Sequence, residues 1–300
     1  MLRANCTLLA ALILFSPSHA DNWPRWRGPT GNGLAADGVY PSKFSSTESV
    51  AWKVELPGRG SSTPVVWGDK IFVTCPIDGK DGVVCYSFDG QELWRQSFGE
   101  ARQGKHRNGS SSNPSPVTDG KSVVVYYKSG TVACVDFAGN IKWETNLQDA
   151  YGEDTLWWDL GTSPVIAADN AVIAVMQDGV KKDSDSFLVA LKLDSGEVAW
   201  KQPRSFECAE ESDQSYTTPS VLQRDDREVI VTFGADHLTG HDAATGKPLW
   251  QCGGFNPDDE GWWRVIASAA VDDELAIVPY GRGEYLAAID VSDPTGDITA

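Results

Sequence analysis

Short runs of β-branched and aromatic residues alternate with glycine- and aspartate-containing turns along most of this chain. The clearest unit covers residues 61–94, where turns at Gly68-Asp69 and Asp89-Gly90 separate apolar runs at 65–66, 71–75, 83–86 and 92–94. Between the runs, no stretch repeats its apolar residues every three to four positions, as an amphipathic helix would. The pattern therefore predicts four short antiparallel strands in this unit.

The unit recurs about every fifty residues. Its first strand follows a Ser/Thr-Pro pair, and the unit starts lie near residues 61, 113, 161, 216 and 266. Four-stranded units at this period are typical of propeller blades. A pair of β-sandwiches, the alternative, would not repeat a strand-by-strand signature. We therefore predict an all-β fold, a β-propeller of four-stranded antiparallel blades with about five blades in this chain.

A tryptophan closes most units, and each such side chain is long, flat and apolar. We predict that these residues pack across the gap onto the next blade, with the indole N–H donating to a backbone carbonyl. The set comprises Trp52, Trp94, Trp143, Trp200 and Trp250. The fifth unit stops before its tryptophan. This structural role would account for much of the high tryptophan content, 12 residues in 300.

The run at residues 241–250, with an Asp-Ala-Ala-Thr-Gly core and a final Trp, resembles the tryptophan-docking repeat of pyrroloquinoline-quinone-type propellers. Residues 192–200 and 88–94 are weaker versions, and the resemblance covers residues 48–300. Residues 23–29 also resemble the leader of exported quinoprotein-like propellers, so we interpret residues 21–47 as a leader strap. Rings of this family usually have seven or eight blades. The resemblance therefore implies an incomplete ring, in which residues 49–54 would complete the last blade of the whole protein.

The first twenty residues form a predicted signal peptide. Arg3 precedes an apolar run at residues 8–15, and Ser18-His19-Ala20 places small residues where signal peptidase reads them. That run is too short to span a bilayer, and no other segment is apolar for long enough. Cys6 precedes the apolar run, so we expect no lipid anchor. Cleavage near Ala20 would release the chain to the periplasm or the medium.

Charge and cysteine content narrow the possible partners. The sequence has 25 Lys and Arg against 42 Asp and Glu, a net charge of −17, and such a surface repels nucleic acids. Five cysteines follow the signal peptide at irregular spacing, which argues against a disulfide framework. Cys85 and Cys134 occupy equivalent repeat positions, so we interpret them as small buried core residues. His237 and His241, four apart on one predicted strand, are too distant to share a metal and are expected to face solvent.

The resemblance to quinoprotein dehydrogenases implies pyrroloquinoline quinone in the ring centre, with a bound calcium, acidic and amide ligands, a catalytic carboxylate and commonly an adjacent cysteine pair. No two cysteines are adjacent here. Asn113, Asp159, Glu211 and Asp213 precede inner strands, but none lies in a matching ligand motif. We therefore assign no catalytic, cofactor-binding or metal-binding residue. A periplasmic oxidoreductase that uses this quinone and calcium is kept as the alternative.

The loops before the Ser/Thr-Pro pairs all lead into innermost strands, so they are expected to converge on one face around the central opening. Aromatic and charged side chains gathered there can bind a ligand. The candidate face comprises Arg107, Asn113, Trp157, Trp158, Asp159, Asp213, Tyr216, Trp262, Trp263 and Arg264. The alternative is that these are connecting loops whose tryptophans fill gaps between blades. We favour a non-catalytic module that binds a protein or polymer partner, similar to the propeller lipoprotein of the outer-membrane barrel-assembly machinery.

Overall fold

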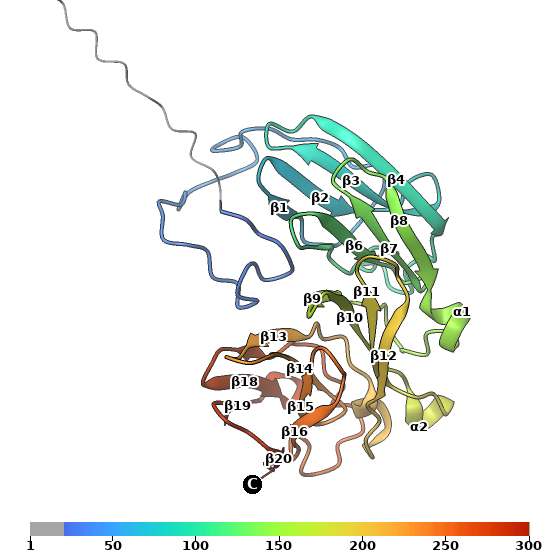
Figure 1. Ribbon diagram of the computed structural model, residues 1–300, viewed down its shortest axis with the longest axis vertical. Coiled ribbons are helices and arrows are strands. Elements are labelled where there is room, and N and C mark those ends of the chain that lie inside the picture. Colours follow the sequence, from blue (N-terminus) through green and yellow to red (C-terminus); the bar gives the residue numbers. More distant parts are fainter. Residues whose placement is uncertain (1–20, 300) are drawn as a thin grey trace, which may run out of the picture.

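The computed structural model describes residues 21–299 of the chain. The predicted signal peptide and Cys6 lie outside this range. Within it, the chain forms five sheets that follow one another in sequence order along an arc (Figure 1). No helix in this part of the chain is long and apolar enough to cross a membrane.

The first three sheets, blades 1 to 3, each contain four strands in sequence order. Blade 1 consists of β1 (Val65–Trp67), β2 (Lys70–Thr74), β3 (Lys80–Ser87) and β4 (Glu92–Glu100). Blade 2 consists of β5 (Val117–Thr118), β6 (Ser122–Tyr126), β7 (Thr131–Asp136) and β8 (Ile141–Asn146), and is followed by helix α1 (Leu147–Tyr151). Blade 3 consists of β9 (Val165–Ala167), β10 (Asn170–Val175), β11 (Phe187–Lys192) and β12 (Val198–Pro203), with helix α2 (Gly179–Lys182) between β10 and β11.

Blades 4 and 5 depart from this plan in their outer strands. Blade 4 consists of β13 (Ser220–Gln223), β14 (Glu228–Gly234), β15 (His237–Asp242) and β16 (Pro248–Cys252), and β20 (Gly296–Asp297) pairs in parallel with β16. Blade 5 has three strands, β17 (Ala270–Val271), β18 (Leu275–Tyr280) and β19 (Tyr285–Asp290). Two 3₁₀ turns, η1 (Glu210–Asp213) and η2 (Gly281–Gly283), complete the elements. The predicted all-β propeller of four-stranded antiparallel blades is confirmed.

The innermost strands β1, β5, β9, β13 and β17 contact one another in chain order. Hydroxyl groups of the Ser/Thr-Pro pairs link their starts, because each accepts the backbone N–H of the equivalent residue one blade earlier. The four bonds, all 2.9 Å, run from Thr63 to Ser115, from Ser115 to Ser163, from Ser163 to Thr218 and from Thr218 to Ser268. The repeated hydroxyl therefore satisfies a backbone donor at every junction between neighbouring blades.

The tryptophans that close the units dock onto the following blade. Each of four indole N–H groups donates to a backbone carbonyl at 3.0 Å, from Trp52 to Phe88, from Trp94 to Phe137, from Trp143 to Leu193 and from Trp200 to Ala243. Each ring lies against a turn glycine of positive φ, where an added Cβ would meet the ring at 2.5–2.8 Å: Gly90, Gly139, Gly196 and Gly246. Trp250 differs, since its backbone pairs with Gly296 of β20 and its ring packs against Gly240.

The segment before blade 1 forms no strand at residues 49–54. Instead, Trp52 docks on the turn of blade 1, and Val54 and Leu56 pack against the blade's core cluster around Val73 and Tyr86. This segment therefore covers the face of blade 1 that carries Val73 and Tyr86.

One histidine of blade 4 is buried where the sequence analysis expected exposure. The expectation that His237 and His241 face solvent is wrong for His241, which is 2% exposed. Its ring contacts the Thr239 hydroxyl and the Gly246 carbonyl, and burial together with nearby Arg204 lowers its pKa to about 4. Arg204 is also buried and donates to Thr239 and three backbone carbonyls. A strand-length estimate of spacing could not reveal this, because the neighbouring blade decides which strand faces are covered.

All five cysteines of residues 21–299 are free, and four of them are buried. Burial raises the pKa of Cys85 to about 12 and that of Cys134 to about 11. These two thiols are therefore protonated members of the cores around blades 1 to 3.

The leader runs from blade 1 to blade 5 (Figure 1). It passes the ends of the inner strands that lie away from the Ser/Thr-Pro pairs. Trp23 exchanges two backbone hydrogen bonds with Val66, and the Pro24 carbonyl accepts the N–H of Thr118 at 2.8 Å. Asn32 then exchanges two hydrogen bonds with the backbone of Val271. The leader thus joins the inner strands of blades 1, 2 and 5 at the end opposite to the loops that precede those strands.

Candidate functional site

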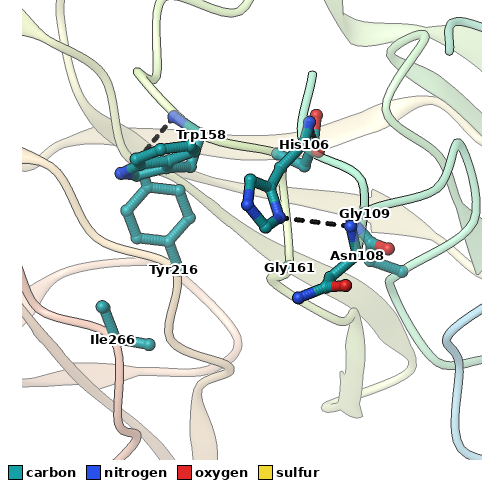
Figure 2. Close-up of a pocket in the computed structure, with 9 residues that line it drawn as sticks. His106, Asn108, Gly109, Trp158, Gly161, Tyr216 and Ile266 are labelled. Atoms are coloured by element: carbon teal, nitrogen blue, oxygen red, sulfur yellow. Dashed lines mark hydrogen bonds between the residues drawn. The ribbon is translucent and has the colours of Figure 1, made fainter. Parts of the chain in front are cut away.

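A cavity of about 510 Å³ opens where the loops before the inner strands meet. This mouth pocket is lined by His106, Asn108, Gly109, Asn113, Trp158, Asp159, Gly161, Tyr216 and Ile266. They come from four loops, which precede β5, β9, β13 and β17. Figure 2 shows His106 and Asn108 on one side of the cavity, and Tyr216 and Ile266 on the other. The repeat explains this convergence, because every such loop enters its blade at the ring centre.

A buried ion pair holds the floor of the mouth pocket. Lys128, in the turn between β6 and β7, pairs with Asp159, and their side chains are 1% and 6% exposed. The Asp159 carboxylate also accepts the backbone N–H groups of Lys105 at 2.7 Å and His106 at 3.1 Å. Burial alone would raise the pKa of Asp159, but these two N–H donors and the Lys128 ammonium outweigh it and lower the pKa. Asp159 therefore ties the loop before β5 to the loop before β9.

Close packing at this pair requires a glycine. A methyl group at Gly109 would overlap the Asp159 carboxylate. Asn113 fastens the same two loops, since its amide oxygen accepts the Ser110 N–H and hydroxyl and its amide nitrogen donates to the Leu160 carbonyl at 3.0 Å. The polar groups beneath the pocket are thus largely engaged in fixing its shape.

The Trp158 indole is the main aromatic surface of the pocket, and it is 38% exposed. Its backbone N–H donates to the Tyr216 hydroxyl at 3.1 Å, and that hydroxyl in turn bonds the Gln214 side chain. The His106 ring meets the indole edge-on at 5.5 Å between ring centroids. The Arg264 guanidinium lies 5.9 Å from the indole and forms an ion pair with buried Glu211. The indole is therefore positioned by its neighbours before any ligand binds.

Of the ten residues predicted for the ligand face, four line the mouth pocket: Asn113, Trp158, Asp159 and Tyr216. Trp263 and Arg264 line an adjoining hollow, and Arg107 lines another. Trp157 and Trp262, in the same loops, are 54% and 55% exposed. Asp213 lies elsewhere, because η1 directs its carboxylate to the Val180 N–H of α2 at 2.9 Å. Burial raises the pKa of Asp213 to about 6.

Sequence reasoning missed several lining residues. His106, Asn108 and Gly109 lie within the loop that was expected to converge on the mouth, yet they carry no motif of their own. Lys128 was also missed, because its Lys-Ser-Gly sequence is that of an ordinary solvated hairpin turn. In the structure, Gln148 of α1 donates to the Lys128 carbonyl at 2.8 Å, and the Lys128 ammonium pairs with Asp159 of the loop before β9.

The donors at the mouth do not fit the calcium ion that a quinoprotein dehydrogenase would need. Asp159 is the single carboxylate lining the mouth pocket, and it is already bound by an ammonium and two N–H groups. Asp213, which would have been needed as a further ligand, lines a different cavity. Over residues 21–299, no three His, Cys, Asp or Glu side chains are grouped to hold a metal ion. Hard cations such as calcium prefer six to eight oxygen ligands.

Known proteins resemble this chain in fold and in repeat sequence. Its fold is similar to that of a quinohemoprotein alcohol dehydrogenase from Comamonas testosteroni (12% identity, TM-score 0.65, 91% of this chain and 48% of the dehydrogenase). It is also similar to the quinohemoprotein alcohol dehydrogenase ADHIIG from Pseudomonas putida HK5 (13% identity, TM-score 0.60, 91% and 48%). BamB from Moraxella catarrhalis matches at 14% identity and TM-score 0.48, over 85% of this chain and 71% of BamB.

The chain spans about half the length of the two dehydrogenases, and likeness at these identities shows the fold alone. No curated protein sequence matches significantly. A family model described as "Outer membrane protein assembly factor BamB" matches residues 43–203, 79–253 and 182–294. Because these overlapping matches together cover most of the chain, it belongs to this family of pyrroloquinoline-quinone-like β-propeller repeats.

Proposed function

We propose that this protein is a non-catalytic binding module of the quinoprotein-like propeller type, which receives a protein or polymer partner at the mouth of the ring. The observation that supports this most is the preformed mouth pocket with its fixed, partly exposed Trp158. A surface indole held by its neighbours gives a partner a large contact area at a small cost in conformational entropy. The family match to a barrel-assembly factor is in keeping with a role in binding.

The chemistry of the pocket supports binding over catalysis. Its one carboxylate is held as an ion by Lys128 and two backbone N–H groups, which makes it a poor proton acceptor near neutral pH. Asn113 is likewise engaged through both atoms of its amide. We propose that the protein acts in the periplasm or outside the cell, where the export signal expected in residues 1–20 would direct it.

A titration with the quinone separates this proposal from a quinone-dependent oxidoreductase. We expect calorimetry of the full-length exported protein with pyrroloquinoline quinone and calcium to show no stoichiometric binding, because the mouth lacks the oxygen ligands for the ion. A calcium-loaded quinoprotein dehydrogenase tested in parallel is the positive control. Tight one-to-one binding, together with oxidation of an alcohol by an artificial electron acceptor, would overturn the proposal.

A further inference from the structure

The mouth pocket is the middle of a longer depression. It shares His106 and Gly109 with a hollow of about 660 Å³ that extends toward Arg59 and Arg107. It shares Ile266 with a second hollow, of about 350 Å³, that extends toward Trp263 and Arg282. We call these three adjoining hollows the mouth groove. Such a shape suits a chain-like ligand better than a single small molecule.

Exposed arginines lie at both ends of the mouth groove, on a strongly acidic protein. Arg59 and Arg107 at one end and Arg282 at the other are exposed. None of the three has an ion-pair partner among residues 21–299. Arg59 donates to the Arg107 carbonyl at 2.6 Å, which keeps the two arginines on neighbouring loops. Asp78 also lines the hollow of Arg59 and Arg107, and Asp236 lines that of Arg282, so arginine exceeds carboxylate at the first end. On a chain with a net charge of −17, these exposed arginines favour a ligand that carries carboxylates.

Between the arginines, the mouth groove presents two indoles and two side-chain amides. Trp158 lies in the mouth pocket and Trp263 in the adjoining hollow, while Asn108 and Gln103 supply side-chain amides. Pyranose rings present a C–H face that stacks on an indole, and hydroxyl groups that pair with amides. A peptide that binds by strand addition would instead need an exposed strand edge. The mouth pocket is lined by loop residues alone.

We propose that the mouth groove binds an acidic oligosaccharide, a chain of uronic acid residues whose rings stack on Trp158 and Trp263 and whose carboxylates pair with the arginines at its ends. This inference rests on the proposed binding function and names the class of partner. It assigns separate contributions to the aromatic and cationic residues, so each can be tested alone.

The test is calorimetric titration of the full-length exported protein with hexagalacturonate, at low and at raised salt. We expect one-to-one binding that weakens with salt. Trp158→Ala should weaken it about tenfold, the effect of losing one stacked ring. Arg107→Gln combined with Arg282→Gln should weaken it by a similar factor, and should also reduce the salt dependence. Phe44→Ala, which removes an exposed ring that lines none of the three hollows, is the matched control and should change nothing.

Two further ligands make the outcome decisive. The fully methyl-esterified hexamer keeps the rings but lacks the charge, so its equal affinity would overturn the inference. A glutamate hexapeptide keeps the charge but lacks the rings. If the peptide binds and the saccharide does not, the saccharide assignment falls while the polymer-binding function stands. If no polymer binds and the quinone with calcium does, the proposed function itself falls. Because Arg107 and Arg282 are exposed, their double variant should fold normally, which an unchanged melting temperature would verify.

Discussion

Replacing Trp143 by alanine is expected to lower the free energy of unfolding by about 3–5 kcal/mol, the range for truncating a buried aromatic residue. The Trp143 ring is 8% exposed and lies in the core between blades 2 and 3. Its N–H donates to the Leu193 carbonyl, and its ring covers Gly196. The substitution therefore leaves a cavity at one blade junction and removes one of the donors to the Leu193 carbonyl, which keeps its bond from the Lys142 ammonium at 3.2 Å. Urea unfolding followed by circular dichroism measures the loss.

Trp52→Ala is the matched control for that variant. Trp52 makes the same 3.0 Å bond and covers the equivalent glycine, Gly90, but its side chain is 37% exposed. Folding buries less apolar surface of Trp52 than of Trp143, so Trp52→Ala should lower the free energy of unfolding by only about 1–2 kcal/mol. A cost below about 1 kcal/mol for Trp143→Ala would contradict the claim that the docked tryptophans hold the blades together.

Replacing Lys128 by methionine is expected to destabilise the protein by about 3–5 kcal/mol at neutral pH, because it leaves the Asp159 carboxylate buried without its cation. Both side chains are almost inaccessible, so solvent would not take the place of the ammonium. The lowered pKa of Asp159 in the folded protein contributes stability above its ordinary pKa of 3.8, and this contribution is lost as the pH falls through the lower folded pKa. The difference between wild type and variant should therefore shrink in acid.

Urea titrations at neutral pH and near pH 3.5 would measure both effects. The double variant with Lys128→Met and Asp159→Leu should regain much of the lost stability, since removing both charges leaves no unpaired ion. A single variant as stable as the wild type, or a difference that grows in acid, would show that the pair does not hold the floor of the mouth pocket.

The fold could be predicted because the residues that make the contacts between blades recur in each repeat. The residues that join neighbours, such as Trp143, Gly196 and Ser163, recur at fixed places in the units, so one signature indicates both the strands and their junctions. Strand edges were less predictable. β20 pairs with β16 in parallel, which no alternation of apolar and polar residues could indicate.

The sequence could predict only those parts of the candidate site that follow from the order of the strands and loops. Trp158 and Tyr216 could be placed at the mouth because their loops lead into inner strands. Asp213 lies in the same loop as Tyr216, but a 3₁₀ turn directs its carboxylate toward α2. Lys128 lies in a hairpin turn whose sequence indicates exposure, and only the packing of α1 and the loop before β9 shows that it is buried. Loop conformations of this kind depend on contacts outside the repeat.

Hydrogen exchange of the full-length protein, with and without hexagalacturonate, tests most directly whether the mouth is the binding face. We expect added protection in the loops at residues 103–113, 157–161 and 262–266, and no change in the outer strands β4, β8 and β12 or in the leader at residues 22–32. Those loops carry the lining residues of the mouth groove, whereas the leader lies at the other end of the inner strands. Protection that falls on the leader or the outer strands, with the mouth loops unchanged, would contradict the account.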